Sequence, residues 1–235
     1  MGDSTKKLDT ATLSAYSRAA IENAEALFVE ASLLNEHGHS ARAYFLAVAS
    51  IEEIGKSLMA FDAQGRNLSD PAVVTKLNRD LSDHKSKIRS AFVGFLVADP
   101  RKNIEPAIDL IIALQRGRES AMYTDLGSDL SILAPAARVR DTAAQDCERL
   151  ARDLLASAHR HIAENKPQKR TIAEDQLFAL RSSDAKLVMS SEDFWWYYID
   201  QVEKGNRDFA ASSIRYRTDF LLKGRTFREP SNDDA

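Results

Sequence analysis

The chain has 235 residues, of which 44% are hydrophobic and 29% charged, with 9 glycines and 6 prolines. This composition favours long helices around a sizeable core and argues against a turn-rich β fold. The formal net charge of −3 excludes a global basic field that would draw the protein onto nucleic acid, although a local basic groove is still compatible with it.

Cysteine usage and the apolar pattern predict a soluble protein of the cytoplasm. Cys147 is the only cysteine, which excludes an intramolecular disulfide framework and fits a reducing compartment. The N-terminal MGDSTKKLDT lacks the apolar segment of a signal peptide. No apolar run approaches the roughly 18 residues of a membrane span, so we expect no membrane contact.

The first part of the chain predicts two long helices joined by a tight turn. Asp9 can cap a helix from residue 10 to about residue 35, whose apolar residues recur at three-and-four spacing. In 35-NEHGHS-40, Gly38 ends this helix and Ser40 caps a second one that runs to about residue 63. Helices joined by so short a turn lie antiparallel, so we predict an all-α fold built as an up-and-down helical bundle.

The bundle is predicted to continue with three more helices and no strand of useful length. One begins at Pro71, which suits the first turn of a helix, and ends near Val97. The stretch 118-RESAMYTDLGSDLSILAP-135 is predicted to be non-helical. The other two helices are expected at about residues 103–117 and 138–164.

A polar stretch that contains proline, 165-NKPQKR-170, is predicted to link the bundle to an appendage. We expect one domain at residues 1–166 and a C-terminal helical extension at residues 167–235. The segment 191-SEDFWWYYIDQV-202 is strongly aromatic. It either docks the extension or makes a dimer contact, or it presents a surface that recognises a partner. The helices of the extension are expected at residues 171–189, 192–204 and 207–223, followed by a frayed tail.

The stretch 41-ARAYFLAVASIEEIGKSLMA-60 places charges inside a core-forming helix. Glu52 and Lys56 have the i,i+4 spacing of a helical ion pair, and Glu53 falls on the other side of Lys56. Gly55 in a helix interior costs up to about 1 kcal/mol relative to alanine, which indicates a close approach by another segment. The charges therefore mark either a flanking ion pair or part of a functional site. The predicted buried seam of this helix comprises Tyr44, Val48, Ile51, Gly55 and Leu58.

Four stretches and the proline that opens the last bundle helix follow one another in the order of a known family: 23-NAEALFVEASLLNEHGHSARAY-44, 47-AVASIEEIGKS-57, 83-DHKSKI-88, 115-QRGRESAMYTDL-126 and Pro135. Together they resemble the AbiV-type family of bacterial abortive-infection proteins, members of the HEPN superfamily of helical bundles. The resemblance covers about residues 10–163. It implies a HEPN-like bundle that defends a bacterial cell against phage by arresting the cell's own metabolism.

The resemblance also implies an activity, with one departure from the superfamily pattern. Many HEPN proteins are metal-independent endoribonucleases whose arginine and histidine, four to six residues apart, pair across a dimer interface. Here the loop after the fourth predicted helix has Arg118 followed by Tyr123. The implied protein is a homodimer that needs no cofactor, takes RNA as its substrate and responds to a phage-encoded activator. The alternative is a non-catalytic defence protein that binds a phage or host partner.

The missing histidine can lie elsewhere in the chain. Arg79 and His84 have the required spacing, and so do Arg152 and His159. Two such spacings are close to chance expectation, so position must decide between them. His84 is the better candidate because it lies in the family-like DHKSKI, although a surface histidine bonded to Asp80 is the structural alternative. Whether Arg79–His84 or Arg118–Tyr123 forms the site stays open.

Metal-free RNA cleavage needs a base for the 2′-hydroxyl, an acid for the leaving oxygen and a cation for the phosphorane. Arg118 and Lys56 are the candidate cations, and His84 is the candidate acid or base. Tyr123 can donate a hydrogen bond or a proton. The alternative is that Tyr123 and its neighbours only pin the loop to the bundle. The predicted site, expected to be close in space, comprises Arg118, Tyr123, His84, Lys56, Glu52 and Glu53, with Glu52 or Glu53 orienting Arg118.

Overall fold

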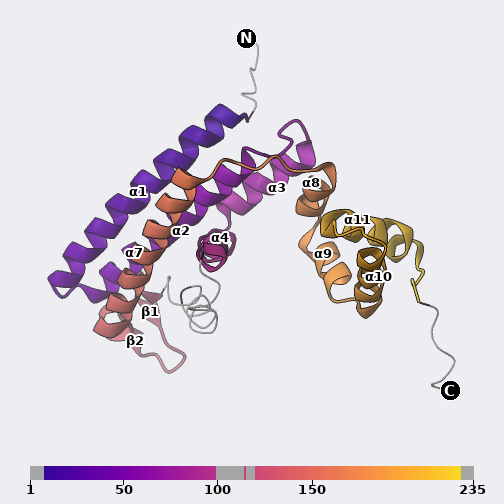
Figure 1. The fold of residues 1–235 in the computed structure, drawn as a ribbon. Helices are drawn as coiled ribbons and strands as arrows, with labels where there is room; N and C mark the ends of the chain where they lie inside the picture. Colours follow the sequence, from indigo (N-terminus) through magenta and orange to yellow (C-terminus); the bar gives the residue numbers. More distant parts are fainter. Residues whose placement is uncertain (1–7, 99–113, 115–119, 229–235) are drawn as a thin grey trace, which may run out of the picture. The chain divides into compact units, whose positions relative to one another are not determined.

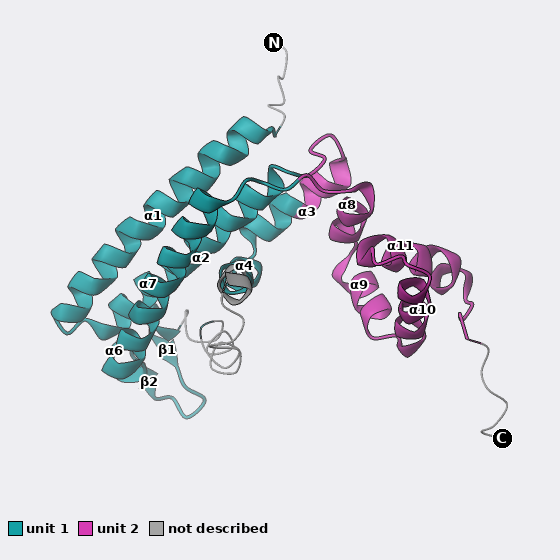
Figure 2. Ribbon diagram, in the orientation of Figure 1, with its two compact units in different colours: residues 1–65, 77–168 teal, residues 66–76, 169–235 magenta. Residues whose placement is uncertain are grey.

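The structure, a computed structural model, describes residues 8–98, 114 and 120–228. The chain divides into two compact units, one of residues 1–65 and 77–168 and the other of residues 66–76 and 169–235 (Figure 2). Helices dominate both units, and the predicted all-α class is confirmed. Within the described part, no helix is both long enough and apolar enough to cross a lipid bilayer.

The first two helices form an antiparallel pair, as predicted (Figure 1). Helix α1 covers Thr10–Glu36 and is capped by Asp9, whose side chain accepts a hydrogen bond from the Thr12 amide at 2.7 Å. Helix α2 covers Ser40–Ala63. Gly38 sits between them with φ of +76°, a conformation that glycine adopts without strain. The amides of Gly38 and His39 bond back to α1, which reverses the chain within three residues.

Small side chains allow α1 and α2 to pack closely. The Ser17 hydroxyl donates to the carbonyl of Ser57 at 2.9 Å, and the Ser57 hydroxyl donates to the carbonyl of Ser17 at 2.8 Å. Ser50 donates in the same way to the carbonyl of Ala24 at 2.8 Å. These buried bonds satisfy each hydroxyl and fix which residues of the two helices lie opposite each other.

The prediction of a single helix from Pro71 to Val97 is wrong, because the helix is interrupted at Asp83. Helix α3 covers Pro71–Ser82 and helix α4 covers His84–Ala98. The Asp83 carboxylate accepts a hydrogen bond from the Ser86 amide at 2.7 Å and thereby caps α4. A hydrogen bond from the Ser86 side chain is the main cause that holds the pKa of Asp83 below its usual value; burial opposes it, and the amide bond adds to it.

The segment predicted to be non-helical holds a short hairpin and a short helix. Strands β1 (Asp125–Leu126) and β2 (Ile132–Leu133) pair antiparallel. Helix α6 covers Pro135–Arg138, so the last predicted bundle helix begins later than expected, as α7 at Asp141–Glu164. The helix predicted at residues 103–117 lies outside the described residues except for Leu114, which is helical.

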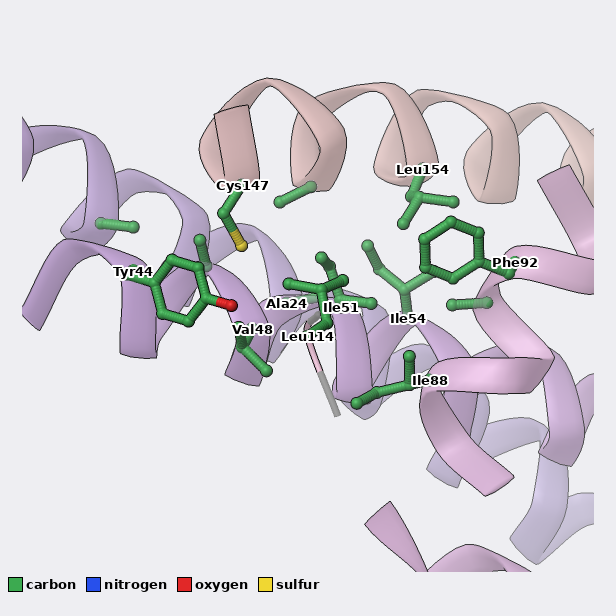
Figure 3. Close-up of a cluster of buried hydrophobic side chains, with 14 of the residues drawn as sticks. Ala24, Tyr44, Val48, Ile51, Ile54, Ile88, Phe92, Leu114, Cys147 and Leu154 are labelled. Atoms are coloured by element: carbon green, nitrogen blue, oxygen red, sulfur yellow. The ribbon is translucent and has the colours of Figure 1, made fainter. Parts of the chain in front are cut away.

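The core of the first unit surrounds α2, which contacts α1, α4 and α7 (Figure 3). The predicted buried seam of α2 is confirmed, since all of its members are buried. Burial raises the pKa of Tyr44 to about 12 and also raises the pKa of the Cys147 thiol, so both groups stay neutral. The labelled side chains in Figure 3 are Ala24, Tyr44, Val48, Ile51, Ile54, Ile88, Phe92, Leu114, Cys147 and Leu154.

The second unit contains helices shorter than predicted. The expected helix 171–189 is split at Leu180, whose backbone is extended, although neither glycine nor proline marks the break. The two pieces are followed by two further helices and a short 3₁₀ turn. These elements are α8 (Ile172–Ala179), α9 (Ser182–Met189), α10 (Glu192–Glu203), α11 (Phe209–Asp219) and η1 (Leu221–Lys223).

The aromatic segment supplies the core of this second unit. Phe194 is fully buried and packs edge-on against Phe209 and Tyr216, and Tyr197 contacts Phe227. The tail is ordered beyond the point where fraying was predicted. Asp193 accepts hydrogen bonds from the amides of Phe227 and Arg228 at 2.7 and 2.9 Å.

Candidate functional site

A buried carboxylate forms the centre of the candidate site. Glu52 lies in the middle of α2 and is 4% exposed. Its Oε2 atom is 3.0 Å from the Nζ of Lys87 and 2.7 Å from the Nδ1 of His84, both in the first turn of α4. The Lys87 side chain is as deeply buried as Glu52, whereas 54% of the His84 side chain is exposed. One carboxylate therefore neutralises a buried ammonium and orients a solvent-facing imidazole.

Gly55 explains how α4 comes close enough to deliver these two side chains. A Cβ atom at Gly55 would lie 1.9 Å from the backbone oxygen of Lys87 and 2.6 Å from its carbonyl carbon. No side chain fits in that space, so the backbones of α2 and α4 touch at this point. The predicted close approach at Gly55 is thus confirmed. The stretches EEIGK and DHKSKI, which carry the family resemblance, meet here.

Lys56 pairs with Glu53 and not, as predicted, with Glu52. The Lys56 Nζ lies 2.5 Å from Glu53 Oε1 at i,i+3 spacing, and both side chains are partly buried. Burial lowers the pKa of Lys56, but the hydrogen bond and charge of Glu53 outweigh it, with smaller contributions from Tyr16 and Glu52. The net effect raises the pKa of Lys56 above its usual value. Lys56 is therefore a cation and not a base at neutral pH.

The remaining predicted residues belong to the loop and hairpin that follow the fourth predicted helix. Tyr123 is 56% exposed beside the β1–β2 hairpin. Asp125 in β1 pairs with Arg138 of α6 at 2.6 Å, which ties the hairpin to that helix. Arg118 lies outside the described residues, so its predicted proximity to Lys56 stays a prediction.

His84 is distinguished from the other histidine candidate by its partner. The Nδ1 atom of His84 bonds to Glu52, a residue that is distant in sequence, so His84 is more than a surface residue of its own helix. Arg79 instead lies 3.8 Å from Asp80. His159 bonds to Glu25 at 2.7 Å, where α7 meets α1, and both side chains are about half exposed. A histidine oriented by a buried carboxylate is better suited to proton transfer than one in an exposed surface pair.

Sequence reasoning gave no role to Lys87, although it belongs to the quoted DHKSKI stretch. Its signal is its i+3 spacing from His84, which puts both residues on one side of α4 once the helix is known to start at His84.

No group of three or more histidine, cysteine, aspartate or glutamate side chains that could hold a metal ion occurs among the residues that the structure describes.

The antiparallel helices around α2, with polar side chains converging at its middle, form a helical bundle with a polar site. Comparison with protein-family models matches residues 12–156, more than half of the chain, to HEPN_AbiV, the AbiV family. The chain belongs to the AbiV family, which indicates a defence protein of the abortive-infection type. In the same comparisons, no curated protein and no solved structure matched the chain.

Proposed function

We propose that the protein is an antiphage effector that cleaves RNA without a metal ion once infection activates it. The observation that carries this proposal is the exposed His84 imidazole held 2.7 Å from a buried carboxylate. Because Nδ1 faces Glu52, Nε2 is the ring nitrogen that can exchange a proton with a substrate. Glu52 fixes the tautomer and stabilises the imidazolium that forms after proton transfer.

In the proposed reaction, His84 Nε2 removes the proton of an RNA 2′-hydroxyl while the 2′-oxygen attacks the adjacent phosphorus. The bond from phosphorus to the 5′-oxygen breaks, and the Tyr123 phenol gives that oxygen its proton. Water then returns a proton from His84 to Tyr123. Lys56 and Arg118 stabilise the negative charge of the phosphorane, with Glu53 holding the Lys56 ammonium in position. The products are a 2′,3′-cyclic phosphate and a 5′-hydroxyl.

The proposed active form is a homodimer whose interface includes the α2 face near Glu52 and the loop at residues 118–126. An exposed apolar surface supports this assembly, because such patches mark interaction sites. Leu126, Leu130 and Ile132 of the hairpin are each at least two-thirds exposed. Light scattering at micromolar concentration should give the mass of two chains, and Ile132→Glu should reduce it to one. A wild-type monomer with no partner present would contradict the dimer.

The experiment that tests the activity is cleavage of single-stranded RNA by the purified chain, with and without phage lysate. We expect cleavage that persists in EDTA, carries cyclic phosphate ends and falls at least a hundredfold in His84→Ala, the size typical of a lost acid–base group. His159→Ala is the matched control. Cleavage that EDTA abolishes, or that His84→Ala leaves intact, would contradict the proposal.

A second candidate function rests on Tyr123. The superfamily's arginine–histidine pair is here an arginine–tyrosine pair, and Tyr123 lies beside a hairpin whose exposed apolar residues are suited to binding another protein. In this alternative the protein defends the cell without catalysis, by binding a phage or host partner. Full protection by His84→Ala in infected cells, together with loss of protection in Tyr123→Ala, would favour it.

A further inference from the structure

A pocket of about 410 Å³ opens between the start of α1 and the end of α3. Its volume lies in the range of small-molecule binding sites. Its walls combine apolar side chains with hydroxyl groups and one amide. The lining residues are Leu8, Thr12, Leu13, Tyr16, Asn78, Leu81 and Ser82.

Two of the helices that line the pocket also lead to the charged cluster. Ser17 and Ser57 exchange hydrogen bonds between α1 and α2, so the turn of α1 that contains Tyr16 meets the turn of α2 that contains Lys56. On the other side, Ser82 is only two residues before His84, which bonds to Glu52. The turns of α1 and α3 that line the pocket are therefore joined to the turns that carry the proposed cation and the proposed base.

The chemistry of the lining fits a flat ring with polar edges. The Tyr16 side chain is 39% exposed, so its ring can still gain a stacking partner. Leu13 and Leu81 offer apolar contact, and the Asn78 amide can both donate and accept hydrogen bonds. Nucleobases of single-stranded RNA are recognised by this combination of an aromatic stack and polar contacts at the base edge.

The charges nearby favour a nucleotide over an uncharged ring. Lys56 belongs to the turn of α2 that bonds to the Ser17 turn of α1, so its ammonium adds positive charge on this side of the pocket. Lys85 and Arg89, both exposed, add positive charge along the start of α4. A base in the pocket would thus have its phosphate next to cationic side chains.

We propose that this pocket binds one nucleobase of a single-stranded RNA and so positions the neighbouring phosphate at Lys56 and His84. The inference rests on the proposed function, because it names the part of the RNA that the site recognises. Tyr16 is the stacking residue, and Asn78 contacts the base edge. Base binding here would hold the 2′-hydroxyl in reach of His84 before any proton moves.

Binding can be measured separately from cleavage with a fluorescent 2′-O-methyl oligonucleotide, which lacks the attacking hydroxyl. Fluorescence anisotropy with the full chain should show about tenfold weaker binding in Tyr16→Ala, the loss expected for one base–aromatic stack. An oligonucleotide with an abasic position in the pocket should bind the native chain about tenfold more weakly, and Tyr16→Ala should add no further loss. Tyr16→Phe, which keeps the ring, should recover most of the affinity.

Leu33→Ala is the matched control, because Leu33 is an exposed apolar residue of the same helix that does not line the pocket. Equal losses of binding for intact and abasic oligonucleotides in Tyr16→Ala would overturn base recognition, even if the native chain cleaves RNA. No binding of either oligonucleotide by the native chain would overturn it too. The expected coupling between Tyr16 and the base, found without cleavage, would support the pocket and refute only the proposed ribonuclease.

Discussion

At the scale of single residues, the site depends on a lysine and a glutamate that are buried together. Lys87 and Glu52 each expose 6% of their side chains, and their charges lie 3.0 Å apart. Removing one partner of a buried pair leaves the other charge uncompensated, which typically destabilises a protein by about 3–5 kcal/mol. The pair therefore links the folding of the bundle to the orientation of His84.

Glu52→Gln should lower the free energy of unfolding by roughly 3 kcal/mol in urea titration, since Lys87 then lacks its counter-charge. Lys87→Met in the same chain should recover most of that loss, because it removes the unpaired ammonium. Neither variant should protect cells, because both lack the carboxylate that orients His84. A double variant that regains stability and also protects would show that Glu52 has no role in the site.

Gly55→Ala tests the close contact of α2 and α4, because that contact decides whether the substitution stabilises or destabilises the protein. In an ordinary helix interior this change stabilises by up to about 1 kcal/mol. Here the new methyl group would meet the backbone of Lys87, so we expect destabilisation of about 1–3 kcal/mol, as for other overpacked cores. Thermal unfolding followed by circular dichroism measures the difference, and a raised melting temperature would contradict the close contact of α2 and α4.

At the scale of elements, the break between α3 and α4 positions the site. It lets α4 begin at His84, which places His84 and Lys87 in one turn against α2. The apolar spacing of Val73, Leu77 and Ile88 continues through the break, so it hides the boundary in the sequence. The visible signal is Asp83, because aspartate is a preferred residue at the N-cap of a helix.

Asp83→Ala should remove the cap of α4 and lower stability by roughly 1 kcal/mol, whereas Asp83→Asn, which can still accept the bond, should lose less. The pKa of Asp83 is lowered in the folded protein, mainly by the bond to Ser86. The Asp83 charge therefore adds to the free energy of unfolding at pH values above the pKa of the unfolded chain. This contribution is lost as the pH falls through the pKa of the folded protein. Urea unfolding from pH 7 to pH 2 should show a smaller acid-induced loss in Asp83→Asn than in the native chain.

The helices of the bundle and the buried seam of α2 could be predicted because apolar periodicity is a local property of the sequence. The partner of each charged side chain could not be predicted in this way. Lys56 has carboxylates on both sides, and Glu52 turns instead to Lys87, which lies on another helix and is identified only by the fold. The pocket at Tyr16 was hidden for the same reason, since its walls come from helices far apart in the sequence.

At the scale of the whole molecule, protection against phage should depend on Arg118 without depending on stability. Arg118→Ala should abolish protection in infected cells while circular dichroism and melting stay as in the native chain, because an arginine in the predicted loop would contribute little to a core. Arg152→Ala is the matched control and should protect, because Arg152 is exposed on the outer face of α7. Folded Arg118→Ala that still protects would remove Arg118 from the site.

The position of Asp175 has a practical consequence for dissecting this protein. Asp175 of α8 is buried and accepts hydrogen bonds from the Arg66 guanidinium at 3.0 Å and the Asn67 amide at 2.9 Å, and Arg66 also lies over the Phe178 ring. The second unit is therefore not continuous in sequence, because it includes a loop from the first third of the chain. A gene fragment that stops at residue 168 would encode that loop without its anchor. Limited proteolysis of such a fragment should cut first near residue 66. A full-length chain with a protease site inserted after residue 168 would instead keep both parts of the second unit together.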